Sequence, residues 1–241
     1  MNIELILKSI IKRFRRPGND RIRYWNPPWI PRWSTLYKEI NIHPHIPEER
    51  ADLFLNFNIG SSEIEVLNWL YSTICLIKPD HILETGAAHG YGTIALASAC
   101  KANGLGTVHS VEIDGSLCQA LEKKLRRLGL QRFTNIICDD SLSFLSKTPL
   151  VFNLGYFDSL CEIRAKEFEI VLDREIIKNM AVFHDTSPYR CLSLPDAPES
   201  SIHEKFRKDI YRLSASEKCS GLFESRLSRG IIVIPIKQQD S

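Results

Sequence analysis

From residue 81 onward, short β-branched runs alternate with longer stretches of helical apolar spacing, and the connections between them are short. Five runs are typical of strands: 81–85, 107–112, 133–138, 151–157 and 180–183. Three stretches between them have helical spacing: 91–102, 115–128 and 161–173. This alternation requires right-handed crossovers and gives a parallel sheet covered by helices on both faces. We therefore predict an α/β fold with a doubly wound, mostly parallel sheet.

The two ends of this repeating region indicate how the fold begins and closes. Ser62 and Glu65 have the spacing of a capping box, and apolar residues follow at helical spacing until Pro79. Near the C-terminus, a helical stretch at 201–213 precedes two runs, 221–225 and 231–236, that predict an antiparallel hairpin. We predict a domain over residues 61–241, preceded by an N-terminal extension over residues 1–60.

The extension has a composition of its own. Residues 1–40 hold nine Lys and Arg against three acids, so the rest of the chain is slightly acidic although the net charge is +2. An acidic body gives no electrostatic reason to expect a nucleic-acid partner. Residues 2–16 predict a basic amphipathic helix, and residues 24–33 are rich in Pro and contain Trp25, Trp29 and Trp33.

Two interpretations of residues 1–33 stay open. The basic helix and the three indoles suit peripheral contact with the inner face of a membrane. They equally suit packing on the following domain, as a cover for its ligand pocket or as a homodimer contact. No run approaches the ~18 apolar residues of a membrane span. The seven cysteines form no Cys-x-x-Cys pair, which favours a reducing, cytoplasmic location.

A glycine-rich segment follows the first strand, where ligands of such sheets bind. Residues 84–92 read Glu-Thr-Gly-Ala-Ala-His-Gly-Tyr-Gly. Small residues let the backbone turn tightly and approach a ligand. The glycine spacing differs from that of the dinucleotide fingerprint, and there is no Gly-Lys-Ser/Thr ending for a triphosphate. By itself this turn is equally compatible with a ligand site and with a plain tight turn.

Acids end the next two strands. Glu112 lies at the end of the second strand, before Asp114, which suits a helix N-cap. A carboxylate at that place is suited to hydrogen bonds with a ribose diol. Asp139, Asp140 and Ser141 end the third strand, where one acid is expected to face an exocyclic amine and the other to cap the next helix.

Together these segments resemble the class I S-adenosylmethionine-dependent methyltransferases. The nearest likeness is to small O-methyltransferases of the catechol and caffeoyl-CoA type and to their bacterial relatives that act on sugars and natural products. The resemblance covers about residues 60–237 and implies a Rossmann-like sheet that binds S-adenosylmethionine. It assigns the methionine part of the cofactor to the glycine turn, the ribose to Glu112 and the adenine to Asp140. The residues that it implies for cofactor binding are Glu84, Thr85, Gly86, Ala87, Gly90, Tyr91, Glu112, Asp140 and Ser141.

The fourth and fifth strands end in acids and a histidine that suit catalysis. Asp158 follows the fourth strand, and His184-Asp185-Thr186 follows the fifth. An acceptor hydroxyl loses its proton as it attacks, which a base or a divalent cation assists. We predict Asp158, His184 and Asp185 as catalytic residues, with Asp158 and Asp185 as candidate ligands of a cation such as Mg²⁺. His184 is the candidate base. A backbone-tied histidine and a loop-capping Asp185 are the structural alternatives.

The resemblance departs from the family pattern at two places. Family members often have Asp-Gly-x-His after the fourth strand, where this chain keeps only Asp158, and Lys178-Asn179 replaces a Gly pair. We predict a methyltransferase enzyme that transfers a methyl group to a hydroxyl on a small molecule or sugar. Two alternatives stay open, namely a catalytically silent relative that binds cofactor or a partner, and another nucleotide-dependent enzyme on a Rossmann-like sheet.

Overall fold

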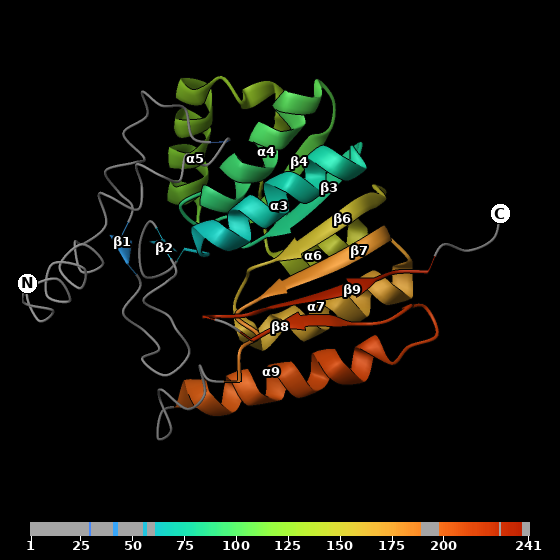
Figure 1. The fold of residues 1–241 in the computed structure, drawn as a ribbon. Coiled ribbons are helices and arrows are strands. Elements are labelled where there is room, and N and C mark those ends of the chain that lie inside the picture. The colour runs from blue at the N-terminus through green and yellow to red at the C-terminus, as the bar shows by residue number, and fades with distance from the viewer. Residues whose placement is uncertain are drawn as a thin grey trace, which may run out of the picture.

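A computed structural model describes Trp29, Asn41–Ile42, Leu55–Asn56 and residues 61–188, 198–226 and 228–237. The described part is built on a seven-stranded sheet with the order β5-β4-β3-β6-β7-β9-β8 (Figure 1). Its strands are β3 (His81–Thr85), β4 (Thr107–Glu112), β5 (Thr134–Cys138), β6 (Phe152–Phe157), β7 (Ile177–His184), β8 (Phe223–Ser225) and β9 (Ile231–Pro235). A small separate pair joins β1 (Asn41–Ile42) to β2 (Leu55–Asn56). The predicted α/β class is confirmed.

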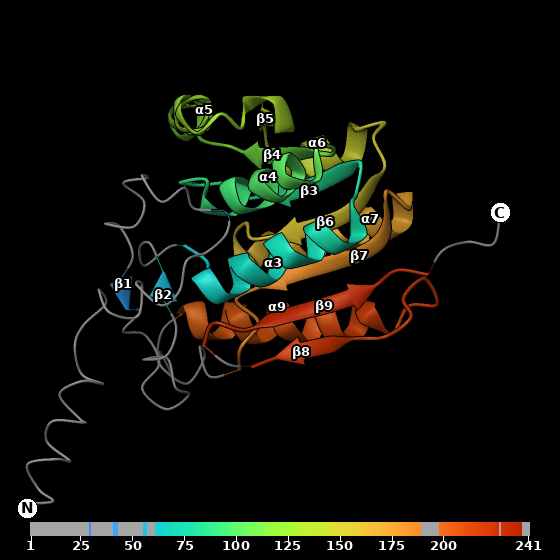
Figure 2. The ribbon, with the colours of Figure 1, turned by 45° about the horizontal axis from the view of Figure 1, so that its top comes forward.

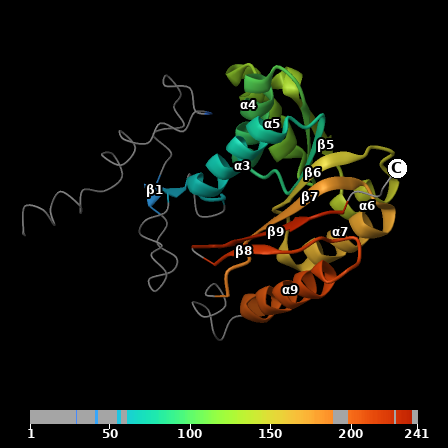
Figure 3. The same ribbon diagram turned by 45° about the vertical axis from the view of Figure 1, so that its right-hand side comes forward.

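The sheet is parallel from β5 to β7 and ends in an antiparallel hairpin. Strand β9 pairs antiparallel with both β7 and β8. Figure 3 shows this hairpin at the edge of the sheet away from β5. Strand β7 begins at Ile177, three residues before the predicted start. The prediction began too late because polar Lys178 and Asn179 interrupt the apolar run.

Helices cover both faces of the sheet (Figure 2). One face carries α3 (Ile64–Ile77), α4 (Tyr91–Asn103) and α5 (Gly115–Leu128). The other face carries α6 (Ser141–Lys147), α7 (Cys161–Arg174) and α9 (Pro198–Ser214). Two apolar clusters correspond to the two faces and contain the sheet residues pointing to each. A short 3₁₀ turn, Gln131–Phe133, precedes β5.

The start of α3 differs from the predicted capping box. Its N-cap is Glu63, and this residue makes no side-chain cap. The Ser62 hydroxyl instead bonds to the Tyr156 hydroxyl at 2.6 Å and to Asp158 Oδ2 at 2.7 Å. The capping-box prediction was wrong because α3 begins one residue later and the Ser62 hydroxyl is used by the neighbouring site.

The order of the strands locates the ligand site. Successive strands are added on one side of β3 (β4, then β5) and afterwards on its other side (β6, then β7). Helix α4 leaves β3 toward one face, whereas α7 leaves β6 toward the other. A crevice opens at such a switch point, outside the carboxyl ends of the strands. The glycine turn after β3 and Asp158 after β6 both lie there.

An aromatic cluster on the α7 face gives a test of the core. The Phe157 and Phe183 rings stack with centroids 4.8 Å apart, and both side chains are fully buried. We expect Phe183→Ala to lower the free energy of unfolding by about 3–5 kcal/mol, since it removes a buried ring and leaves a cavity. Phe223→Ala is the matched control because Phe223 is 58% exposed. Denaturant titration that gives equal losses for both variants would contradict this packing.

Candidate active site

The glycine turn is held in a conformation that side chains rarely adopt. Gly86, Ala88 and Gly90 all have positive φ angles, of 79°, 45° and 80°. A Cβ on Gly86 would lie 2.5 Å from the carbonyl oxygen of Asp158. The turn therefore packs directly on the backbone that follows β6, and a side chain at Gly86 would disturb the fold as well as a ligand.

A small cleft of about 40 Å³ lies over this turn. Its lining comes from the glycine turn, the start of α3 and the end of β6: Ser61, Ser62, Glu84, residues 86–92 and Asp158. A larger hollow of about 790 Å³ lies at the starts of β6 and β7, beside Asn153 and Lys178. We place the candidate site at the smaller cleft, because the switch point and the clustered acids are there.

Glu112 is fixed beside the turn by two backbone donors. The Ala88 N–H donates to its Oε2 at 2.7 Å, and the Asp114 N–H donates to its Oε1 at 2.9 Å. Asp114 caps α5, as predicted. Each carboxylate oxygen accepts more than one hydrogen bond, so Glu112 is oriented and still able to accept from a diol.

Glu84 and Thr85 have their side chains in buried networks. Glu84 Oε2 accepts from Thr93 Oγ1 at 2.5 Å and from Ser110 Oγ at 2.6 Å. Burial raises the pKa of Glu84 to about 7, against the effect of these hydrogen bonds. The Thr85 hydroxyl donates to Glu167 of α7 at 3.1 Å. Only the backbone of Thr85 is left for the predicted cofactor contact.

Asp140 and Ser141 also serve local structure. Asp140 Oδ1 accepts from the Ser143 N–H at 2.8 Å, so Asp140 caps α6. Ser141 is buried and bonds to Glu167. The alternative acid, Asp139, is exposed and accepts from the Asp140 N–H. The adenine role of Asp140 stays a prediction, with Asp139 as its competitor.

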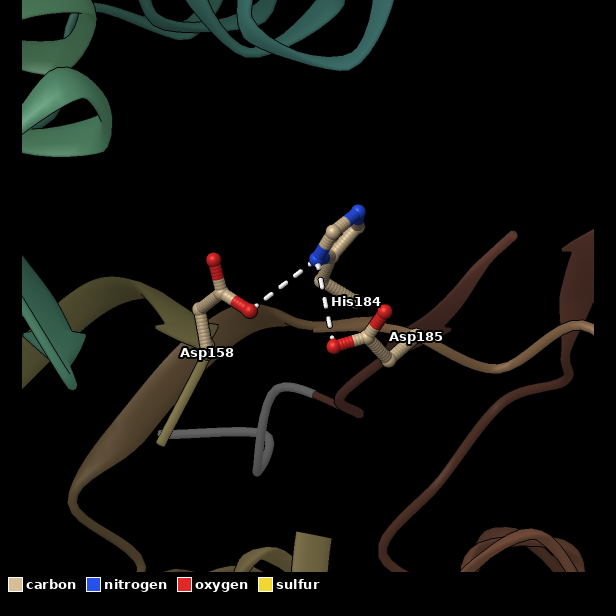
Figure 4. A group of neighbouring side chains, drawn as sticks. All are labelled: Asp158, His184 and Asp185. Carbon is tan, nitrogen blue, oxygen red and sulfur yellow. Dashed lines mark hydrogen bonds and ion pairs between the residues drawn. The ribbon is translucent and has the colours of Figure 1, made fainter. Parts of the chain in front are cut away.

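The three predicted catalytic residues meet at the ends of β6 and β7 (Figure 4). His184 Nδ1 lies 3.0 Å from Asp158 Oδ1 and 3.8 Å from Asp185 Oδ2. His184 is fully buried and Asp185 nearly so, whereas the Asp158 side chain is 16% exposed. Asp158 therefore lines the cleft, and the other two lie behind it.

Glu63 completes the surroundings of His184. Its Oε2 lies 2.6 Å from His184 Nε2, and its Oε1 accepts from the Arg229 N–H at 2.8 Å. Both residues are fully buried. With Asp158 on the other ring nitrogen, the imidazole is held between two carboxylates.

Two buried arginines complete the cluster. Arg229 donates to both oxygens of Asp185, from Nε at 2.6 Å and from Nη2 at 2.9 Å. Arg164 Nη2 lies 3.2 Å from Asp158 Oδ1 and 3.5 Å from Asp185 Oδ2. We call Glu63, Asp158, Arg164, His184, Asp185 and Arg229 the charge network.

The charge network favours ionised groups throughout. Burial alone would lower the pKa of His184, but Asp158, Asp185 and Glu63 together raise it to about 9. Burial opposes ionisation of Glu63 too, yet His184 and Arg229 lower its pKa to about 2. The charge network thus combines three acids with two guanidinium groups and a histidine whose pKa is raised. Both ring nitrogens of His184 face carboxylates and its side chain is fully buried, so its role as a base stays a prediction.

The same groups decide whether a divalent cation fits. One ligand atom from each of Asp158, His184 and Asp185 lies within 4.8 Å of the others. Arginine N–H groups, however, already bond to these carboxylates, and both ring nitrogens of His184 face carboxylates. A cation would add positive charge beside two guanidinium groups that cannot lose a proton. The donor set does not fit a divalent cation in this arrangement.

Sequence reasoning missed four functional candidates: Ser62, Glu63, Arg164 and Arg229. One signal was available for Arg164, since it lies on the face of α7 that also buries Phe168 and Val171. An arginine on an apolar face indicates a buried partner. Glu63 and Arg229 gave no such signal, because 166 positions separate them and only the fold brings them together.

The pKa of His184 predicts how stability depends on pH. The unfolded residue titrates near 6.5, whereas the folded residue titrates near 9. The stabilisation is therefore complete below pH 6.5 and is lost as pH rises through 9. We expect the free energy of unfolding to fall by on the order of 3 kcal/mol over this range, as measured by urea titrations at several pH values.

His184→Asn is the control, because asparagine removes the titrating group and keeps a polar side chain. Its stability should change little between pH 7 and 9, beyond what other groups contribute. If wild type and variant lose stability in parallel over this range, the imidazolium is not the source of the change.

Comparisons with known proteins bear on the family and the fold. Residues 83–186 match a protein-family model described as a methyltransferase domain. This segment runs from β3 through Thr186 and contains both the glycine turn and the catalytic candidates. Among curated proteins, no sequence matches the chain.

Solved structures show the same fold at low sequence identity. The SAH-bound methyltransferase PaMTH1 of Podospora anserina is 18% identical, with a TM-score of 0.65 over 74% of this chain and 80% of that one. The O-methyltransferase TomG of Streptomyces achromogenes, solved with SAM, is 17% identical, with a TM-score of 0.61 over 73% and 81%. A Bacillus cereus O-methyltransferase in complex with SAH is 17% identical, with a TM-score of 0.60 over 75% and 84%.

The family match covers the segment that carries the glycine turn and the acids at the strand ends, and the solved structures match the sheet as a whole. The predicted resemblance is therefore confirmed. Residues 83–186 match a methyltransferase-domain model, and the described part of the chain has the fold of the solved SAM- and SAH-bound methyltransferases.

Proposed function

We propose that this protein transfers a methyl group from S-adenosylmethionine to a hydroxyl on a small molecule or sugar. The observation that carries the proposal is the meeting of three features at one switch point. The glycine turn follows β3, the oriented Glu112 ends β4, and Asp158 ends β6 with its side chain on the cleft. The family match and the two reported neighbours described as O-methyltransferases support the same reaction.

The residues around the cleft fit this cofactor. The turn presents backbone rather than side chains, and Glu112 offers a carboxylate fixed by the turn itself. Gly92 lies directly over the Glu84 carboxyl, where a Cβ would collide with it. We assign the methionine part to Gly86, Ala87, Gly90 and Tyr91 and the ribose to Glu112. When bound, S-adenosylmethionine supplies a methyl group on a sulfonium.

The acceptor is expected to lie against Asp158. Of the three predicted catalytic residues, Asp158 alone lines the cleft, where its Oδ2 accepts from the Ser62 hydroxyl at 2.7 Å. Asp158 would accept a hydrogen bond from the acceptor hydroxyl and orient its oxygen. His184 and Asp185 would act as positioning residues behind it. The nearby cations Arg164 and His184 lower the pKa of Asp158 although burial opposes this, which makes it a weak base.

A weak base suits an acidic acceptor. A general base is most effective when its pKa lies near the operating pH, so a carboxylate of lowered pKa needs an acceptor that loses its proton easily. A phenol is far more acidic than a sugar alcohol. Asp158, the member of the charge network that lines the cleft, therefore favours a phenolic hydroxyl over an aliphatic one. A divalent cation was the other predicted route to deprotonation, and its proposed ligands are already paired with arginines.

The test has two stages. Mass spectrometry of the purified protein should detect co-purified S-adenosylmethionine or S-adenosylhomocysteine. Incubation with S-adenosylmethionine should then release S-adenosylhomocysteine faster with 3,4-dihydroxybenzoate than with methyl glucoside as probe. Cofactor binding without turnover of any hydroxyl probe would favour the silent-relative alternative, and absence of binding would contradict the proposal.

Glu112→Ala tests the ribose assignment. Loss of a hydrogen bond to a charged group costs about 2–3 kcal/mol, so cofactor affinity should fall by roughly 30- to 150-fold. Asp114→Asn is the matched control, since asparagine removes a neighbouring acid and keeps the N-cap of α5. Calorimetry on both variants, with melting curves to establish that they fold, would refute the assignment if Glu112→Ala binds like wild type.

The N-terminal extension adds proposals of its own. We propose peripheral membrane contact through residues 1–33, a homodimer and a cytoplasmic location from the sequence alone. Within residues 1–33, all but Trp29 lie outside the described residues. Among the described residues, no helix is long and apolar enough to cross a membrane. Trp29 is buried at 2% exposure, and its Nε1 donates to Asn68 Oδ1 of α3 at 2.7 Å. This contact supports packing on the domain for Trp29, rather than the membrane contact considered for it.

A further inference from the structure

The charge network stands where a divalent cation was predicted, and it holds positive groups of its own. We propose that the guanidinium groups of Arg229 and Arg164 occupy the place of that cation, so that the acceptor end of the site works without a bound metal ion. The proposal rests on the proposed function only for the reaction that the site serves. Its claim about cations is independent of any acceptor.

The first support is that the arginines already bond the carboxylate oxygens that a cation would need. The cation would need Asp185 Oδ2, which lies 2.9 Å from Arg229 Nη2 and 3.5 Å from Arg164 Nη2. The second carboxylate is that of Asp158. Its Oδ1 accepts from Arg164 Nη2 at 3.2 Å and lies 3.0 Å from His184 Nδ1. Arginine meets a carboxylate in a planar fork, and Arg229 uses that fork on Asp185.

The second support is that neither arginine is free to swing away. Arg229 Nη1 also donates to the Ser61 carbonyl at 2.7 Å. Arg164 donates from Nε to the Ser159 carbonyl and from Nη1 to the His184 carbonyl, both at 2.6 Å. The two side chains are 5% and 3% exposed. Their departure would leave buried carbonyl groups without donors, which is costly.

The third support is charge balance. Glu63 supplies the third acid, and its carboxylate bonds to both His184 and the Arg229 backbone. With Glu63 included, three carboxylates surround two guanidinium groups of fixed positive charge and a histidine whose two ring nitrogens both face carboxylates. A divalent ion would have to displace buried positive charge that is already paired, whereas a metal site is normally built from acids without fixed cations.

The backbone conformation of Asp185 limits which substitutions can test this pairing. Its φ angle is 61°, a left-handed conformation that is uncommon outside glycine. Asparagine and aspartate tolerate this conformation best. An Asp185→Asn variant should therefore keep the backbone and lose the charge, which makes it a suitable probe of cation binding.

The experiment is a titration of the full chain with Mn²⁺, followed by the electron paramagnetic resonance signal of the free ion, with and without S-adenosylhomocysteine. With wild type, we expect the signal at each Mn²⁺ concentration to equal that of buffer without protein. This should hold up to about 1 mM, the weak end of protein sites for hard cations. Stoichiometric binding by wild type that disappears in Asp185→Asn would overturn the proposal.

Arg229→Met tests the replacement directly, since it removes the guanidinium and leaves the carboxylates. Because a neighbouring guanidinium repels a divalent cation at close range, the folded variant should bind Mn²⁺ at least about tenfold more tightly than wild type. Arg207→Met is the matched control, because Arg207 pairs with Glu224 outside the charge network, at 2.9 Å. A folded Arg229→Met variant without this gain would show that the acids do not form a cation site, and the proposal would fail.

If Arg229→Met does not fold, the comparison of wild type with Asp185→Asn decides alone. Failure of the proposed function has a different signature. If wild type does not bind S-adenosylhomocysteine, the methyltransferase proposal is overturned and the Mn²⁺ result stays valid. Normal binding of S-adenosylhomocysteine together with tight Mn²⁺ binding at Asp185 would overturn the inference alone.

Discussion

A protonated histidine without solvent contact is the interaction on which the candidate site depends. His184 is fully buried, and an isolated imidazolium in that place would be far less stable than a neutral ring. Glu63 and Asp158 on its two nitrogens reverse that preference. Because Glu63 comes from the start of α3 and Asp158 from the end of β6, the charge also fixes how these elements meet.

This arrangement links the two halves of the site. The cofactor half is made of backbone: a glycine turn on β3, packed on the chain after β6 and tied to Glu112 by an N–H of Ala88. The acceptor half is made of charged side chains from α3, β6, α7, β7 and the β8–β9 turn. Asp158 belongs to both, since its backbone touches Gly86 and its carboxylate joins the charge network. A change at Asp158 is therefore expected to affect both halves.

Much of this could be predicted from the sequence, because local signals and topology agree. Alternating runs gave the parallel sheet, and the rule that ligands bind at strand ends led to the glycine turn, Glu112 and Asp158. Side-chain roles were harder to predict. Thr85 and Ser141 have the right positions, yet both bond to Glu167 on the other face of the sheet. His184 has the right position for a base, but Glu63 and Arg229, far away in sequence, change its chemistry.

A crystal structure with S-adenosylhomocysteine would test the central claim most directly, because that claim states where the cofactor binds. The account predicts the ribose hydroxyls within hydrogen-bond distance of the Glu112 carboxylate, the sulfur beside Gly86 and Asp158, and Arg229 still paired with Asp185. A cofactor bound elsewhere, such as in the hollow beside Asn153 and Lys178, would contradict it. So would a metal ion held by Asp158 and Asp185 with Arg229 displaced.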